Sequence, residues 1–362
     1  MSGTRVPAEA LHTLSSAVQG TVIGPGDTDY EDARHVWNAM ADRRPAVIVR
    51  AGTVADVPPA LRLARQHGLP VAVRGGGHSV AGYGTVDGGL VLDLGACRDI
   101  EVEPEARTVS VGPGATLADL DRATTAHGLA VPVGVISATG VAGLTLGGGF
   151  GWLTRAYGLT VDNLVAAEVV AADGTTHHAG PDGDRELLWA LQGGGGNFGV
   201  VTSFTYTAHP LPPTVLAGNF IYARPRWKQA LRAFAGWVQG LPDEMTSIIT
   251  VIAPPPELEL GTEPVLVVGF AWAGANHREG LDHAGRLSQA SPPDAEEVGP
   301  VAWTEWQSAM DFLFPRGVRA YWKNTGLSRL DEEVIEVLCA RGAEQTWQGT
   351  AFDLHHMGGA FG

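Results

Sequence analysis

The chain has 362 residues, enough for about two domains of roughly 150 residues each. A hydrophobic share of 44% and a charged share of 17% are typical of a globular protein and exclude wholesale disorder. The 24 basic and 39 acidic residues give a net charge of −15, which argues against nucleic acid or an anionic membrane surface as a partner.

The cysteine content and the N-terminal residues indicate the cellular compartment of the protein. Cys97 and Cys339 fit neither a disulfide framework nor a zinc motif, so we expect a reducing, cytoplasmic setting. Residues 1–19 lack the basic and apolar regions of a secretory signal. No apolar run reaches the roughly 18 residues that a membrane span needs. We therefore expect no membrane partner.

The first part of the chain predicts a mixed α+β unit. Helices are expected at 7–18, 29–41, 54–64, 116–127 and 185–191, and strands at 46–50, 70–74, 90–94, 100–102, 108–111, 164–172 and 200–206. Thr116 is a residue type that caps helix N-termini, so it is expected to open one of these helices. The many short strands favour an α+β unit over a strictly alternating one.

Prolines at 210, 212 and 213 mark a change of composition, so we expect domains at 1–210 and 211–362. Beyond this boundary the pattern predicts strands at 215–222, 245–252 and 264–272, and helices at 226–239, 276–289 and 331–341.

Glycine is the unusual component, with 49 residues, about twice the usual share. Eight glycines lie in 75–95, seven in 134–151 and five in 193–199. Consecutive glycines allow backbone N–H groups to converge on an anion, and Arg74 could add charge. Tight turns and close packing are the plainer explanation for each cluster. Three clusters between strands favour a long ligand such as a dinucleotide.

A nicotinamide-binding fold is one way to use such a pattern. The glycines at 147–151 would then bind the pyrophosphate, and Glu168 would bind a ribose. However, no clean apolar strand precedes this cluster, and the other two clusters would remain unexplained. A nicotinamide-dependent dehydrogenase therefore stays an alternative.

Three runs of sequence contain the clusters: PAVIVRAGTVADVPPALRLARQHGLPVAVRGGGHSVAGY, TGVAGLTLGGGFGWLTRAYGLTVDNL and ELLWALQGGGGNFGVVTSF. Together they resemble the FAD-linked oxidases of the berberine-bridge-enzyme-like type, in the vanillyl-alcohol-oxidase superfamily, over about residues 35–210. The resemblance implies an α+β fold with a PCMH-type FAD-binding domain of two α+β subdomains. It also implies a substrate domain with an antiparallel sheet flanked by helices.

The implied activity is removal of a hydride from a C–H next to a hydroxyl or amine, with O2 as acceptor. Sugars, alcohols and secondary metabolites are the implied small-molecule substrates. FAD would be bound covalently through His78. The implied cofactor-binding residues are Arg74, Gly75, Gly76, Gly77, His78, Ser79, Gly82, Thr139, Gly140, Gly143, Gly147, Gly148, Gly149, Asn163, Val200 and Val201.

Within this set, the resemblance implies that residues 74–79 wrap the pyrophosphate and that Val200 and Val201 contact the adenine end. Ile136 stands where many relatives carry a cysteine that forms a second covalent link, so we expect a single link. Thr139 stands where relatives tune access of O2, which leaves oxidase and dehydrogenase behaviour open.

For catalysis, the resemblance points to residues 319–324 as a substrate-domain strand. On such a strand Tyr321 and Lys323 would share a face and could polarise or deprotonate a substrate hydroxyl. Relatives continue beyond the end of this sequence with a tyrosine-bearing segment that supplies the base. A fragment, a naturally short form and a flavin-binding protein with little turnover therefore stay open.

Two histidine pairs could suggest a metal site. His177-His178 and His355-His356 are adjacent in sequence, so on a strand their side chains would point to opposite faces. No carboxylate–histidine spacing supports either pair. We therefore predict no metal site.

Overall fold

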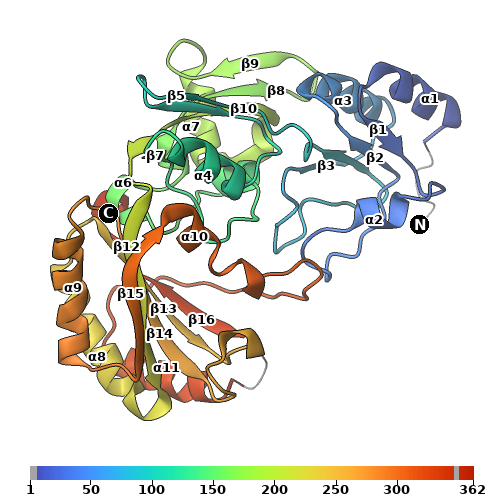
Figure 1. Cartoon of the computed structure of the whole chain (residues 1–362). Helices are drawn as coiled ribbons and strands as arrows, with labels where there is room; N and C mark the ends of the chain where they lie inside the picture. The colour runs from blue at the N-terminus through green and yellow to red at the C-terminus, as the bar shows by residue number, and fades with distance from the viewer. Residues whose placement is uncertain (1–5, 346–349) are drawn as a thin grey trace. The chain divides into compact units, whose positions relative to one another are not determined.

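The computed structural model describes residues 6–345 and 350–362 (Figure 1). These residues belong to two compact units. Unit 1 consists of Met1–Gly151, Leu159–Pro210 and Gln307–Trp322, and unit 2 consists of Trp152–Gly158, Leu211–Trp306 and Lys323–Gly362. Two short segments therefore belong to the unit that does not contain their sequence neighbours. The assignment of cofactor and substrate to separate domains stays a prediction.

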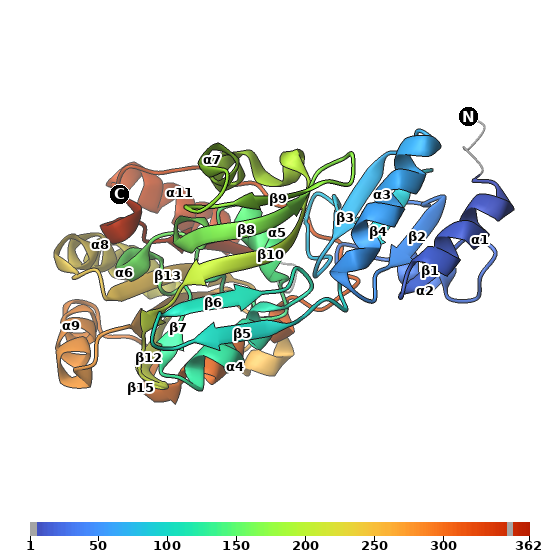
Figure 2. The same cartoon turned by 90° about the horizontal axis from the view of Figure 1, so that it is seen from above.

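The first sheet of unit 1 contains four strands in the order β1-β2-β4-β3. Their bounds are Thr21–Ile23 for β1, Val47–Arg50 for β2, Val71–Arg74 for β3 and Leu90–Asp93 for β4. Strands β2, β4 and β3 are parallel, and β1 is antiparallel to β2. Helices α1 (Ala8–Ala17) and α3 (Val57–Gln66) contribute leucines and alanines to its core, and Figure 2 shows α3 lying across this sheet.

The second sheet of unit 1 is antiparallel, with the order β5-β6-β10-β8-β9. Its strands are β5 (Ile100–Glu103), β6 (Thr108–Val111), β8 (Leu164–Val170), β9 (Thr176–Ala179) and β10 (Val200–Thr207). Helices α4 (Leu117–Thr125), α5 (Val141–Leu146) and α7 (Arg185–Gly194) accompany it, and β7 (Leu129–Ala130) pairs with β11 (His209–Pro210).

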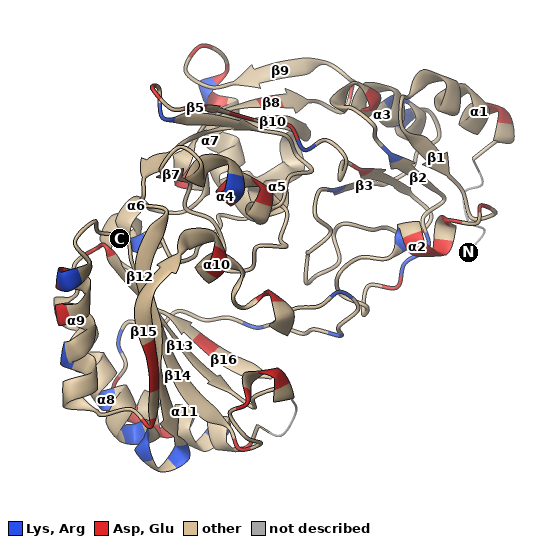
Figure 3. Cartoon of the chain, viewed as in Figure 1, with Lys and Arg blue, Asp and Glu red and all other residues tan. Residues whose placement is uncertain are grey.

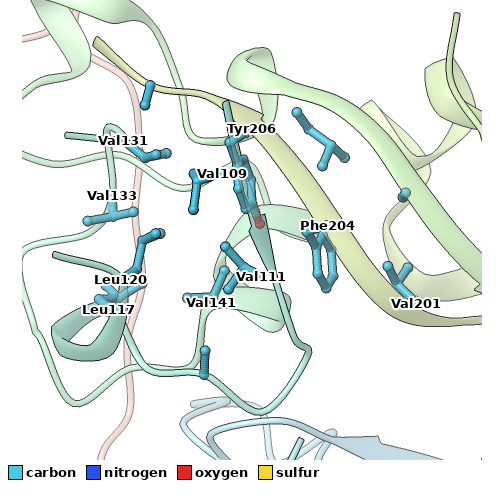
Figure 4. Close-up of a cluster of buried hydrophobic side chains, with 14 of the residues drawn as sticks. Val109, Val111, Leu117, Leu120, Val131, Val133, Val141, Val201, Phe204 and Tyr206 are labelled. Carbon is cyan, nitrogen blue, oxygen red and sulfur yellow. The ribbon is translucent and has the colours of Figure 1, made fainter. Parts of the chain in front are cut away.

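The core of the second sheet is built by alternating strand residues. Phe204 and Tyr206 on β10 and Val109 and Val111 on β6 are fully buried, and they share one cluster with leucines of helix α4 (Figure 4). This period-two pattern is the one that predicted the strands. The two sheets give unit 1 the α+β architecture expected from the sequence.

Helix α4 begins as the sequence predicts. The Thr116 hydroxyl accepts a hydrogen bond from the Asp119 amide at 3.2 Å, and the Asp119 carboxylate accepts one from the Thr116 amide at 3.0 Å. This reciprocal cap satisfies backbone donors that the first turn of a helix leaves unpaired. The N-cap prediction is confirmed.

Unit 2 is built on an antiparallel sheet with the order β15-β12-β14-β13-β16. The strands are β12 (Thr214–Ala223), β13 (Met245–Ile252), β14 (Val265–Trp272), β15 (Ala295–Ala302) and β16 (Ala351–His355). The helices are α6 (Thr154–Tyr157), α8 (Trp227–Trp237), α9 (His277–Ala290), α10 (Trp303–Ser308) and α11 (Glu332–Ala343). An antiparallel sheet with flanking helices is the expected architecture.

Aromatic residues join this sheet to its helices. Phe220 and Phe270 from the strands share a buried cluster with Trp227 and Phe234 of α8 and Leu287 of α9. On the surface, ion pairs join α8 to α11: Lys228 contacts Glu336 and Glu332, and Arg232 contacts Glu332. Figure 3 shows basic segments, in blue, near the helices labelled α8 and α11.

Short 3-10 turns complete the chain at Val54–Asp56, Val161–Asn163, Gly195–Phe198, Arg224–Arg226, Val238–Gly240, Pro256–Leu258, Asp311–Leu313 and Gly359–Phe361.

Two predicted elements differ from the structure. The helix expected at 29–41 is only α2 (Tyr30–Arg34), because His35 is extended and the following residues form hydrogen bonds to distant segments. The strand expected at 319–324 is wrong, since these residues form neither helix nor strand. Ala320 instead exchanges hydrogen bonds with the side chain of Asn38.

Candidate functional site

The first glycine cluster follows β3 and packs backbone against backbone. A Cβ atom on Gly75 would lie 2.7 Å from the carbonyl oxygen of Pro113. A Cβ atom on Gly76 would lie 2.5 Å from the amide nitrogen of Gly140, in the second cluster. Both distances are too short for any side chain. Close packing therefore explains these glycines directly, and it brings residues 75–79 beside residues 139–140.

The backbone of this loop has unused donors. Among the described residues, none accepts a hydrogen bond from the amide N–H groups of residues 75–79. Buried backbone donors are nearly always paired in proteins, and a series of converging N–H groups is a common anion-binding arrangement. The loop therefore fits the diphosphate of a dinucleotide such as FAD through its backbone.

Arg74 holds this loop in place. Its guanidinium donates to the carbonyl oxygens of Gly84 at 2.9 Å and Ala33 at 2.6 Å. It also lies 3.3 Å from the Asp93 carboxylate. Burial lowers the pKa of Arg74, and Asp93 opposes that effect. The side chain thus connects the loop to the first sheet, and direct contact between Arg74 and a cofactor stays a prediction.

His78 lies against an aromatic ring. Its imidazole stacks on the indole of Trp37, with ring centroids 4.6 Å apart and planes inclined by 22°. Burial lowers the pKa of His78, the positive charge of Arg316 lowers it further, and Asp311 acts in the opposite direction. The imidazole is therefore favoured in its neutral form, which is the nucleophilic one.

Residues 311–320 lie beside this histidine, although they are far away in the sequence. The Asp311 carboxylate accepts hydrogen bonds from the Ser137 amide at 2.7 Å and the Ser137 hydroxyl at 2.5 Å. These bonds fix the loop that contains Ile136, which is buried. The single covalent link stays a prediction.

The second glycine cluster surrounds the short helix α5. Gly140 precedes the helix, and Thr139 beside it is partly exposed. A Cβ atom on Gly143 would meet nothing within 4 Å, so packing does not explain this glycine. Gly148 and Gly149 adopt positive φ after the helix ends. Since a Cβ atom would fit at Gly143, contact between this glycine and a cofactor stays a prediction.

Other predicted cofactor residues have internal partners. The Asn163 side chain donates to the Leu159 carbonyl at 2.8 Å and pairs with His209 at 2.6 Å. Val200 and Val201 are buried at the start of β10. Their predicted contacts with FAD, like those of Ser79, Gly82 and Gly147, stay predictions.

The predicted catalytic pair does not share a strand face. Tyr321 is 73% exposed and belongs to unit 1, whereas Lys323 begins the last segment of unit 2. The sequence offered no reason to choose Trp37, Asp311 or Arg316. These three residues contact residues 77–78 and 137, which are tens to hundreds of positions away in the sequence. A local sequence pattern cannot predict contacts between segments so far apart.

The nicotinamide alternative does not fit the sheet. Glu168 lies on β8, which has antiparallel neighbours on both sides, and its carboxylate pairs with His178 at 3.0 Å. A nicotinamide-binding glycine fingerprint requires a parallel strand–helix–strand unit. Here the glycines at 147–149 follow helix α5 instead of a strand.

Within residues 6–345 and 350–362, no group of three or more His, Cys, Asp or Glu side chains is arranged to hold a metal ion. The helices in this described part also include none with both the length and the apolar character for a membrane crossing.

Comparison with known proteins finds similarity to FAD-linked oxidoreductases. Residues 45–180 match the family described as FAD binding domain. An FAD-linked oxidoreductase of Dictyostelium discoideum is 29% identical over 355 residues, which cover 97% of this chain and 75% of that protein. The (R)-6-hydroxynicotine oxidase of Paenarthrobacter nicotinovorans is 36% identical over 238 residues, or 66% of this chain and 51% of the oxidase.

The fold is also similar to a solved structure. Crystalline 6-hydroxy-D-nicotine oxidase from Arthrobacter nicotinovorans superposes with a TM-score of 0.75 and 29% identity, covering 81% of this chain and 64% of that one. This chain therefore spans about half to two thirds of the length of the nicotine oxidases that it matches.

Proposed function

Because residues 45–180 form an FAD-binding domain and the chain is homologous to FAD-linked oxidoreductases, we propose that it is an FAD-dependent oxidase. Its substrate is a sugar, alcohol or secondary metabolite with a C–H next to a hydroxyl or amine, and O2 is the acceptor. FAD supplies the hydride acceptor for this chemistry when it is bound. The free cysteines Cys97 and Cys339 support a reducing, cytoplasmic setting.

The observation that carries this proposal is the row of unpaired backbone donors at 75–79 beside a neutral His78. The amides bind the diphosphate, and the buried Arg74 keeps their loop in place through Gly84 and Ala33. Gly143 allows the backbone of α5 to approach the cofactor.

His78 then forms the covalent link. A ring nitrogen would bond to the 8α-methyl carbon of bound flavin as the imidazole N–H and one methyl C–H break. FAD would supply the acceptor for the two protons and the C–H electron pair, and O2 would reoxidise it to give hydrogen peroxide. Trp37 and the low pKa of His78 keep the imidazole in place and neutral for this bond.

Acid precipitation tests the link. Wild-type protein should keep its yellow colour in the pellet, whereas His78→Ala should release FAD into the supernatant, because the backbone donors of the loop remain. A proteolytic flavin peptide should contain His78 and no cysteine. A yellow His78→Ala pellet would exclude His78 as the attachment site.

Anaerobic addition of sugars, alcohols and amines tests the reaction. A substrate should bleach the flavin absorbance, and air should restore it with formation of peroxide. A chain that holds FAD but is bleached by none of them, at concentrations that saturate binding, would favour a flavin-binding protein with little turnover.

A further inference from the structure

We propose that Trp37 is a positioning residue for attachment of the flavin, a role that rests on the covalent bond of His78 proposed above. The two rings stack at 4.6 Å with an inclination of 22°, so one face of the imidazole is covered by the indole. This stack does not cover the unprotonated ring nitrogen, because its lone pair lies in the plane of the ring and not on its faces.

Trp37 is itself held rigidly. Its side chain is 1% exposed, and its indole N–H donates to the Phe314 carbonyl at 2.9 Å. Its backbone amide donates to the Gly77 carbonyl at 3.0 Å, and its carbonyl accepts from the Gly317 amide at 2.9 Å. The indole of Trp322 contacts it edge-on at 6.2 Å. Trp37 therefore offers a fixed surface directly beside the histidine loop.

The histidine loop needs such a surface. Three glycines precede His78, and Gly77 adopts a φ of +70°. Glycine restrains its neighbours less than any other residue, so the local backbone alone does not orient the imidazole. The stack with Trp37 sets the plane of the ring and hence the direction from which a ring nitrogen attacks. A displacement of about 1 Å at a reacting centre can lower a rate on the order of 10²-fold.

Two variants of Trp37 distinguish the effect of its stacking on His78 from the effect of its packing in the core. Trp37→Phe keeps an aromatic ring but loses the hydrogen bond to Phe314, whereas Trp37→Leu removes the stack. Each chain is produced in a riboflavin-starved host and then supplied with FAD. Uptake is followed by quenching of FAD fluorescence, and the covalent fraction by flavin in the acid pellet over time.

We expect Trp37→Leu to slow covalent attachment by roughly 10- to 100-fold, with FAD uptake changed less than threefold. Trp37→Phe should keep most of the wild-type rate of covalent attachment. The matched control is Trp227→Leu in unit 2, since Trp227 is also 1% exposed and donates its indole N–H to a carbonyl, that of Tyr222, at 2.9 Å. This control should attach flavin at the wild-type rate.

A readout without flavin completes the test. In the flavin-free wild-type protein, the His78 ring protons should show the NMR shift that a stacked indole causes, and Trp37→Leu should abolish it. If wild-type protein forms no covalent flavin, the proposed function fails at its covalent step. If wild-type protein attaches FAD and folded Trp37→Leu does so equally fast, the role of Trp37 is refuted.

Discussion

Gly76 and Gly140 lie back to back: a Cβ atom on Gly76 would be 2.5 Å from the Gly140 amide nitrogen, and one on Gly140 would be 2.4 Å from that of Gly76. Neither backbone can give way without moving its whole loop. This pair joins two of the three glycine clusters, 64 positions apart, into one surface.

Gly76→Ala should therefore lower both stability and FAD affinity. Forcing a methyl group into packed backbone costs about 1–3 kcal/mol, and the loop at 75–79 must shift.

Gly143→Ala should differ from Gly76→Ala, because its Cβ atom meets nothing within 4 Å. We expect it to keep its unfolding temperature while its FAD affinity falls. Thermal unfolding and fluorescence titration with FAD measure the two effects, and equal FAD binding by Gly143→Ala and wild type would remove Gly143 from the cofactor site.

Asp311→Asn should loosen the loop before Thr139. The carboxylate accepts two hydrogen bonds from Ser137, and an amide can offer only one oxygen for them. Hydrogen bonds to charged groups contribute about 1.5–3 kcal/mol, so we expect a loss of that size in the free energy of unfolding measured in urea. Ser137→Ala removes only the hydroxyl bond and should cost less. A larger loss for Ser137→Ala than for Asp311→Asn would contradict the geometry.

Local elements of this fold follow from sequence, because their signals are local. Thr116 and Asp119 are three residues apart, and the alternation that buries Phe204 and Tyr206 is visible within one strand. The same locality explains the error at 29–41. The backbone of Trp37 bonds to Gly77 and Gly317 instead of to the preceding helical turn, and nothing within 29–41 signals those partners.

The candidate site follows the same division: its local motifs were predictable from the sequence, and its contacts between distant segments were not. The glycine runs and the family resemblance point to His78. They do not show that packing explains Gly75 and Gly76, that Arg74 is turned into the interior, or that Asp311 holds Ser137. Those facts depend on side-chain direction and on pairs of segments that meet only in the folded chain.

The buried pair of Tyr206 and Thr145 allows a test by a double-mutant cycle. Their hydroxyls lie 2.7 Å apart in the core, and both side chains are fully buried. Tyr206→Phe leaves the Thr145 hydroxyl without this partner, which should cost about 1–3 kcal/mol of unfolding free energy. Thr145→Val combined with Tyr206→Phe removes both hydroxyls and should cost less than the sum of the single changes. Strict additivity in urea unfolding would show that the two hydroxyls do not interact.

The stability of unit 2 should depend on pH through His356. Arg155 lies 3.3 Å from Nε2 of His356, and arginine can only donate, so Nε2 accepts. Burial and then the charge of Arg155 lower the pKa of His356 to about 4. The unfolded value is about 6.5, so the unfolded chain binds more protons between these two values. The stability that the neutral form of His356 contributes to the folded state is therefore complete above about pH 6.5, and it is lost as the pH falls toward 4.

His356→Gln should flatten this dependence, because glutamine can still accept from Arg155 but does not titrate. The unfolding temperature measured between pH 7 and pH 4 should fall less steeply than in the wild type. Some slope should remain, since burial also lowers the pKa of His355 while Asp353 opposes that effect. Identical slopes in the two proteins would exclude His356 as a source of the pH dependence of stability.

The route of the chain has a consequence during synthesis. Trp37 and the Phe314 carbonyl that fixes its indole are 277 positions apart, so at 5–20 residues per second they leave the ribosome roughly 14–55 s apart. During that interval a nascent chain presents the histidine loop before Phe314 and Asp311 exist. A fragment that ends at Pro210 would keep every glycine cluster yet lack Phe314 and Gly317, which bond to Trp37, and Asp311, which bonds to Ser137. We therefore expect such a fragment to hold the histidine loop less rigidly than the 362-residue chain does.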